Sequence, residues 1–219
     1  MLPLDKIPTT KSERWKYTNL PRALKTLSLK PAVLGWSDSA SISFIEKKAP
    51  AAEQYKDTVL WDLNTLESKD LKFITEQSNI DVVAKDGQWL SPRIVIHVAD
   101  NQQFSIMERQ AGKGAYWKNT VVQIVLGKNA RLRHYRFFDE DEFGVSTSFV
   151  HIRIGRDSTY ESFTLTEGKG FARSQIHAEI LGENARCLLN GINLLSGEQH
   201  ADTTITIEHQ AAHSSSKQM

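Results

Sequence analysis

The sequence predicts a mainly β fold built as a solenoid, in which short strands stack in successive coils behind a partly helical N-terminal region. From Arg93 onward, apolar and polar residues alternate with a period of two, which is the period of a β-strand. A corner made of Gly, any residue, Asn or Asp, and a small residue recurs at Gly127, Gly155 and Gly182, which are 28 and 27 residues apart. No proline follows Pro92 to interrupt a backbone ladder.

Residues 1–90 form the predicted N-terminal region. The segment Thr10–Glu13 has the spacing of a capping box and predicts a short helix that carries Trp15. Pro21 predicts a second short helix, which Lys30 and Pro31 bring to an end. A third, amphipathic helix is expected over about residues 65–77, because four apolar residues follow at roughly helical intervals: Leu63, Leu66, Leu71 and Ile74.

Residues 91–219 form the predicted β core. After the alternating segments near Ile94 and Phe104, strands are expected over 121–126, 132–138, 146–154, 159–165, 174–181, 186–195 and 203–209. A β-sandwich or a solenoid would fit these strands. The corner that repeats at one spacing favours the solenoid, because each coil buries its inner face only against its neighbours. We expect Gly, Asn and Asp at the corners because they tolerate positive φ.

Composition narrows the classes of function. The chain has 219 residues, enough for its own core, and a net charge of +1, which gives no electrostatic footprint for nucleic acid. No apolar run is long enough to span a bilayer, and the first residues lack the apolar core of a signal peptide. The single cysteine, Cys187, suits a reducing compartment. We therefore expect a cytoplasmic protein.

Two stretches resemble a known family. Glu13–Leu20 reads ERWKYTNL and is similar to a signature near the start of the SufB/SufD family of iron–sulfur cluster assembly proteins. The stretch from Leu189 through His200 to Gln218 resembles the SufD branch. The resemblance implies a right-handed parallel β-helix. It also implies a non-catalytic scaffold subunit, not an enzyme, that supports iron delivery and cluster assembly with SufB and SufC as partners.

Family members continue well beyond the point where this sequence stops, so the chain resembles a truncated product, a fragment or one part of a split gene. The continuation would carry the segments that dock SufB and SufC. If residues 203–209 form the last complete strand of an interrupted solenoid, its open edge can recruit another chain. The sequence therefore predicts self-association through the C-terminal coil.

Candidate metal ligands are His200, His209, His213 and Cys187, since imidazole and thiolate groups bind iron and zinc. Structural roles compete with this interpretation: His200 would cap a turn, His209 and His213 would be polar residues at a coil edge, and Cys187 would fill the core. Because His209 follows two isoleucines on one strand face, a buried, hydrogen-bonded histidine is expected there. No resident cofactor is expected; iron or an iron–sulfur cluster would bind only in a complex with partners.

Two other functions are also compatible with the sequence. Carbohydrate-active enzymes also use the β-helix, and this reading predicts a groove with stacked aromatic side chains. A plain structural solenoid without a metal role is the third possibility.

Overall fold

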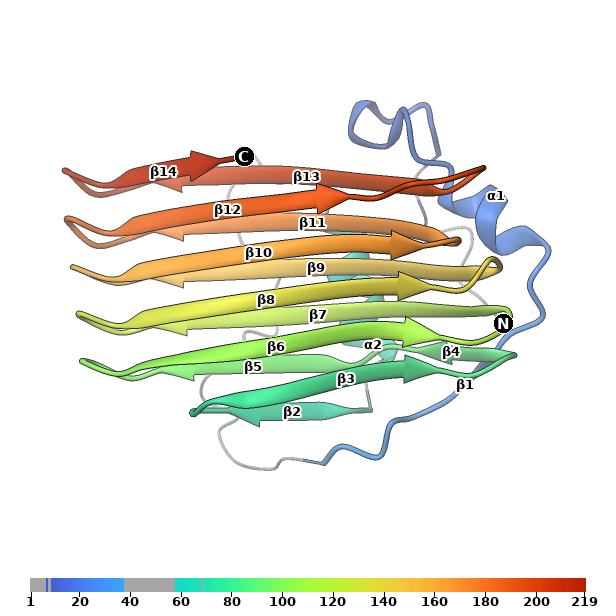
Figure 1. The fold of residues 1–219 in the computed structure, drawn as a ribbon, viewed down its shortest axis with the longest axis horizontal. Coiled ribbons are helices and arrows are strands. Elements are labelled where there is room, and N and C mark those ends of the chain that lie inside the picture. The colour runs from blue at the N-terminus through green and yellow to red at the C-terminus, as the bar shows by residue number, and fades with distance from the viewer. Residues whose placement is uncertain (1–6, 8, 38–57, 68) are drawn as a thin grey trace.

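The main body of the chain is a parallel β-solenoid of about five turns (Figure 1). The structure is a computed structural model that describes residue 7 and residues 9–37, 58–67 and 69–219. Every strand pairing within these ranges is parallel. A sandwich joined by antiparallel hairpins is thereby excluded, and the predicted solenoid is confirmed.

The chain passes back and forth between two sheets, and from β5 onward each coil contributes one strand to each of them (Figure 1). Sheet A holds β1 (Lys30–Pro31), β2 (Leu71–Ile74), β4 (Gln88–Leu90), β5 (Arg93–Val98), β7 (Tyr116–Leu126), β9 (Gly144–Ile154), β11 (Phe171–Ile180) and β13 (His200–His209). Sheet B holds β3 (Ser78–Ala84), β6 (Gln103–Gly112), β8 (Arg131–Glu140), β10 (Thr159–Gly168), β12 (Arg186–Asn193) and β14 (Ser215–Gln218).

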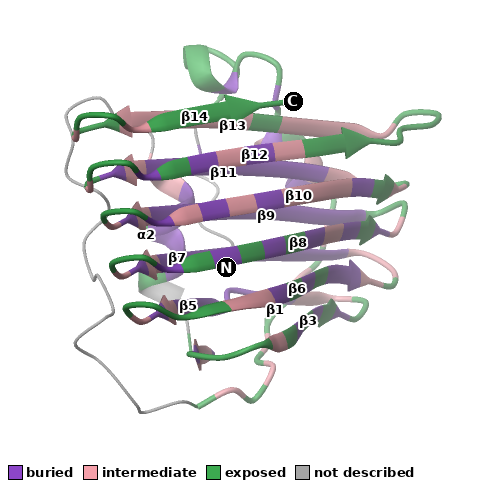
Figure 2. Ribbon diagram, turned by 60° about the vertical axis from the view of Figure 1, so that its left-hand side comes forward, coloured by how far each residue is buried: buried purple, intermediate pink, exposed green. Residues whose placement is uncertain are grey.

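The inner faces of the two sheets form the main core. Val122, Val150 and Ile176 are register partners on β7, β9 and β11, and all three belong to this buried cluster. Equivalent positions in successive coils therefore carry apolar, mostly β-branched side chains, which suit a pleated surface. Figure 2 shows the resulting bands of buried residues along the strands.

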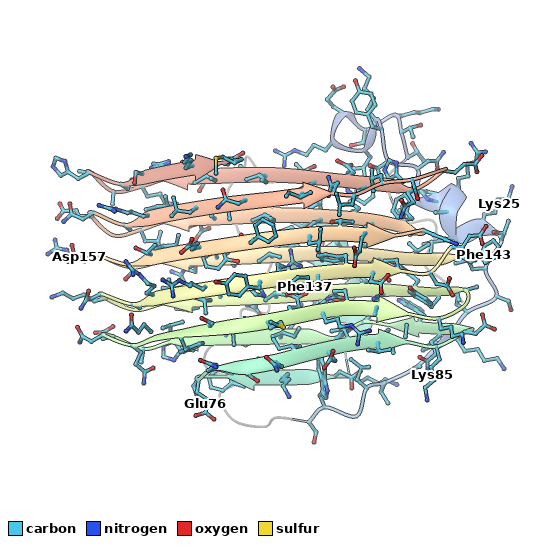
Figure 3. The ribbon with its side chains drawn as sticks, in the orientation of Figure 1. Lys25, Glu76, Lys85, Phe137, Phe143 and Asp157 are labelled. Carbon is cyan, nitrogen blue, oxygen red and sulfur yellow. The ribbon has the colours of Figure 1, made fainter. Side chains whose placement is uncertain are left out.

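One corner of every coil holds a residue with left-handed backbone conformation. Asn101, Asn129, Asp157, Asn184 and His213 have φ between 53° and 62°, and Asp157 marks this edge in Figure 3. Neighbouring corner side chains are linked: Asn129 Nδ2 donates to Asn101 Oδ1 and Asn184 Nδ2 to Asp157 Oδ1, each over 3.0 Å. The Asn and Asp part of the corner pattern is thus explained by αL geometry.

The corner glycines have a different role from the expected one. Gly127, Gly155 and Gly182 are not among the residues with positive φ. A Cβ atom on Gly182 would lie 2.0 Å from the backbone nitrogen of Arg156. Glycine is needed because successive corners approach too closely for any side chain.

The N-terminal region packs on the outer face of sheet A. A 3-10 helix spans Glu13–Trp15 and α1 spans Leu20–Lys25, so both expected short helices are present. Thr10 does not occupy the predicted capping position, because the helix begins at Glu13 with Ser12 before it, and Ser12 makes no side-chain cap. The buried side chains of Trp15 and Trp61 join Trp89 and Trp117 of sheet A in a second core; Trp61 belongs to α2, which lies behind sheet A in Figure 1.

The predicted helix over 65–77 is wrong. The helix α2 spans Val59–Glu67, and Leu71–Ile74 is strand β2. Leu71 and Ile74 have a helical spacing in the sequence. In the structure, however, β2 pairs with β5 and Ile74 belongs to the main core, so tertiary pairing overrides the local pattern. Strands β2, β3 and β4 therefore belong to the sheets although they precede residue 91.

None of the helices in the described ranges is long and apolar enough to cross a membrane.

Candidate functional site

The four predicted metal ligands do not gather into one site. Cys187 belongs to the buried core between the sheets. His200 and His209 are the first and last residues of β13, which puts them about 30 Å apart at roughly 3.3 Å per residue. His213 occupies the αL position of the last corner, with φ 56°, where the other coils have Asn or Asp.

His200 lies at the junction between the N-terminal region and sheet A. Its ring stacks on Phe171 with 4.8 Å between centroids, and its Nε2 lies 3.4 Å from Thr18 Oγ1. Burial lowers the pKa of His200, opposed by the charge of Asp202. His200 thus helps to attach the segment that carries the family signature.

Arg173 is the centre of that attachment. Its guanidinium lies 4.0 Å from the ring centroid of Trp15, and its Nη2 donates to the carbonyl oxygen of Arg14 over 2.7 Å. Arg173 and Thr18 also both donate to the carboxylate of Asp202. Residues of the signature segment are in this way joined to β11 and β13, more than 150 positions further along the chain.

His209 and Cys187 have clear structural environments. His209 is exposed, contrary to expectation, because it lies where β13 enters the corner; its Nδ1 is 2.7 Å from Ser214 Oγ and its Nε2 is 3.0 Å from Ser216 Oγ. Burial of the Cys187 thiol raises its pKa to about 12, so the thiolate form that binds metals is disfavoured.

A group of potential ligands that the sequence did not reveal lies on the outer face of sheet A. His151 of β9 and His177 and Glu179 of β11 offer nitrogen and oxygen atoms that are all within 4.8 Å of one another. Glu179 Oε1 lies 3.6 Å from His151 Nε2 and 4.0 Å from His177 Nε2. We call these three residues the histidine cluster; the described residues contain no other such group.

The histidine cluster is covered on two sides. The Trp61 ring of α2 meets the His151 ring edge-on, 6.0 Å between centroids. Beside His177 is a void of about 10 Å³, roughly the space of one water molecule, and Arg14 and Phe149 line it. The imidazole side chains are 3% exposed, whereas the Glu179 side chain is 16% exposed and opens toward solvent.

The electrostatics of the histidine cluster favour a neutral His177 and an ionised Glu179. Burial, followed by the charge of His151, lowers the pKa of His177 to about 4. The hydrogen bond with His151 lowers the pKa of Glu179. The second oxygen of Glu179, Oε2, faces Arg153 Nε at 3.6 Å, and Glu208 is the register partner of Glu179 on β13.

A second polar group lies inside the solenoid. Glu108 of β6 accepts hydrogen bonds from Arg136 Nε at 3.1 Å and Gln110 Nε2 at 2.7 Å, and lies 3.0 Å from His134 Nε2. All four side chains are buried. Although burial raises it, the pKa of Glu108 is held well below its usual range, by Arg136 first and then by His134.

Further buried polar side chains lie between the sheets at the start of β7 and the end of β8. Lys118 Nζ lies 3.0 Å from Glu140 Oε1, and Tyr116 OH donates to Glu140 Oε2 over 2.7 Å. The charges inside the solenoid are therefore paired with one another, as buried charges must be.

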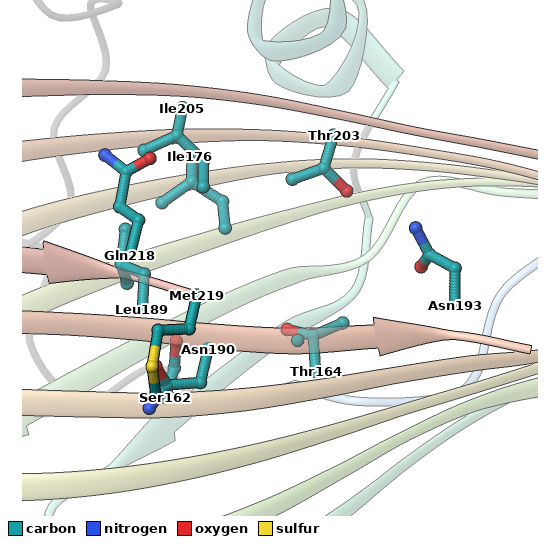
Figure 4. Close-up of a pocket in the computed structure, with 11 residues that line it drawn as sticks. Ser162, Thr164, Ile176, Leu189, Asn190, Asn193, Thr203, Ile205, Gln218 and Met219 are labelled. Atoms are coloured by element: carbon teal, nitrogen blue, oxygen red, sulfur yellow. The ribbon is translucent and has the colours of Figure 1, made fainter.

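A cavity of about 340 Å³ lies between the two sheets at β13 and β14, and Figure 4 shows the residues that line it. Ile176, Leu189, Ile205 and Met219 contribute apolar lining. At this margin β13 pairs with β11 and β14 with β12. Self-association through this coil stays a prediction.

The chain is similar to one protein family and to two related proteins. Residues 81–219 match the model of a family described as SUF system FeS cluster assembly, SufBD core domain. The chloroplastic protein ABCI7 of Arabidopsis thaliana is 27% identical over 124 residues, 54% of this chain and 26% of that protein. An iron–sulfur cluster assembly SufBD family protein of Synechocystis is 25% identical over 142 residues, 59% of this chain and 31% of that protein. The matches thus span under a third of either relative, and no solved structure matches significantly.

Proposed function

This chain belongs to the SufBD core-domain family of the SUF iron–sulfur cluster assembly system, and we propose that it acts there as a SufD-like scaffold subunit. In this role it binds SufB and SufC in the cytoplasm and supports iron delivery and cluster assembly without catalysing a reaction. The observation that carries the proposal is the family match over residues 81–219, which begins in β3 and includes β14.

The interior of the solenoid supports a scaffold role. The groups that could serve as acids, bases or nucleophiles there are fully buried, and Glu108 and Glu140 are each engaged by cationic partners. A catalytic group has to reach its substrate within hydrogen-bonding distance. The interior polar residues instead hold the two sheets together.

The carbohydrate-active alternative receives no support from the surface. Its groove requires stacked aromatic side chains, but among the described residues the exposed aromatic side chains lie on separate elements: Tyr17 follows the first helix, Tyr135 is on β8, and Phe143 is in the turn before β9. Figure 3 shows Phe143 at one end of the strands and Phe137 of β8 near their middle, so these two aromatic side chains do not stack.

The proposal is tested in cells that make the protein naturally. A tag is placed at the chromosomal gene, the protein is purified, and mass spectrometry identifies its partners and the mass of the natural product. We expect SufB and SufC in amounts comparable to the tagged chain, and neither in the untagged control strain. Purification without either partner would refute the proposal, and recovery of SufD in place of SufB would assign the chain to the SufB branch instead.

A further inference from the structure

We propose that His151, His177 and Glu179 bind one divalent first-row transition-metal ion on the outer face of sheet A. The site differs from the ligands predicted from the sequence, and it does not depend on the proposed SUF role. Two imidazoles and one carboxylate are a donor set that suits iron, cobalt or zinc and leaves further coordination positions for water.

The backbone already fixes the positions of the three side chains. His151 and His177 are register partners on adjacent parallel strands, and Glu179 is two residues beyond His177, on the same face. Ligand atoms around one ion, at about 2.0–2.1 Å from it, lie roughly 3 Å from one another. Separations of 3.6 and 4.0 Å between Glu179 Oε1 and the two Nε2 atoms close to that value through small side-chain rotations.

The two oxygen atoms of the Glu179 carboxylate have different partners. Its Oε1 faces both imidazoles, while its Oε2 faces the half-exposed guanidinium of Arg153. Such an outer partner orients a ligating carboxylate. Glu208 adds a second negative charge on the next strand, which offsets the positive charge of Arg153.

Access and shielding are also in place. Glu179 is the most exposed member of the histidine cluster, so an ion can enter beside it. Trp61 of α2 covers the His151 ring, and the void beside His177 has room for about one water molecule. The N-terminal region would therefore enclose a bound ion on the sides away from Glu179.

The test is titration of the purified, metal-free chain with Co²⁺, followed by calorimetry and by visible absorption. We expect one Co²⁺ per chain, with nitrogen ligation in the spectrum. Glu179→Gln and His177→Asn should each weaken binding by at least about tenfold. Because the readout needs no SUF partner, it can fail or succeed independently of the proposed function.

His97→Asn is the matched control. His97 lies on the same row of sheet A as Glu179 but three strands away, through Val125 and Arg153, which is about 14 Å at roughly 4.8 Å per strand. The His97→Asn variant should bind Co²⁺ with the same affinity as the unmodified chain. His209→Asn should also bind normally, since His209 belongs to the last corner.

Three results would overturn the proposal: no binding of Co²⁺ by the unmodified chain, undiminished binding by Glu179→Gln, or loss of binding in His209→Asn in place of the cluster variants. Circular dichroism verifies that each variant is folded. If His177→Asn does not fold, the test rests on Glu179→Gln. This variant should fold, because glutamine has the size of glutamate and the Glu179 side chain is partly exposed. Paramagnetic broadening of histidine ring signals in the unmodified chain gives a check without substitution: His151 and His177 should broaden first, and broadening confined to other histidines contradicts the site.

Discussion

Replacing Glu108 by Leu should destabilise the solenoid strongly, because the substitution leaves a guanidinium without its counter-charge inside the core. Arg136 donates to Glu108 through Nε at 3.1 Å and Nη2 at 3.3 Å, and its side chain is 1% exposed. Gln110 and His134 also face the same carboxylate. Breaking a buried ion pair on one side costs about 3–5 kcal/mol, a large share of a typical total stability of about 5–15 kcal/mol.

The assay is urea unfolding followed by circular dichroism. With a slope of about 2–3 kcal/mol per molar urea, the midpoint of Glu108→Leu should fall by about 1–2.5 M. The double variant Glu108→Leu/Arg136→Met should recover much of that loss, since apolar replacement of a whole buried pair is often neutral.

Glu161→Gln provides the matched control. Arg133 and Glu161 form an ion pair in the same sheet, with 3.6 Å between Nε and Oε2, but their side chains are 51% and 44% exposed. Removing such a surface pair should cost no more than about 1 kcal/mol. Equal destabilisation by Glu108→Leu and Glu161→Gln would refute the interior ion pair.

The pH dependence supplies a second readout. The folded-state pKa of Glu108 is lowered, so its stabilisation is fully present above the unfolded value of about 4.3 and is lost as the pH falls below it. Burial lowers the pKa of His134 as well; its contribution is present above about pH 6.5 and declines as the pH falls. Both proteins keep His134, so the difference between them reports Glu108: the unmodified chain should lose its advantage over Glu108→Leu as the pH falls below about 4.3, and an advantage that grows over this range would contradict the assignment.

Three further predictions concern other parts of the fold. Trp15→Ala should detach the N-terminal segment before the solenoid unfolds, seen as faster amide exchange in residues 13–25 with unchanged exchange in β7 and β9; uniform loss of protection would contradict it. Gly182→Ala should lower the free energy of unfolding by at least about 1–3 kcal/mol, because the new Cβ would meet backbone atoms. Gly197→Ala should lower it by only about 1–2 kcal/mol, because Gly197 has φ 63° but no atom within 4 Å of the new Cβ. A larger loss for Gly197→Ala than for Gly182→Ala would contradict the close approach of the corners. Cys187 should resist a thiol reagent at pH 8 until urea unfolds the chain, because its thiol is buried with a pKa of about 12; rapid labelling of the native protein would show an accessible thiolate.

The limits of the sequence prediction follow from particular residues. The strands after Arg93 were predictable because their inner residues alternate and their corners repeat. The strand at Leu71–Ile74 was not, because the spacing of its two apolar ends, Leu71 and Ile74, is helical and only pairing with β5 selects the strand.

The candidate site was largely hidden from the sequence. His151 and His177 are separated by nearly one coil, as are the repeating corners, and this spacing was the one available signal. The predicted ligands were chosen by their proximity along the chain, but β13 separates His200 from His209 by its full length.

The sequence by itself determined the solenoid and its family, because a repeated corner and a strand period are local features that every coil displays. The tertiary structure alone decided which side chains meet, because parallel stacking joins residues one coil apart. It placed His177 beside His151 and Glu108 beside Arg136, and it used Arg173 to fasten Trp15 onto a strand more than 150 residues away.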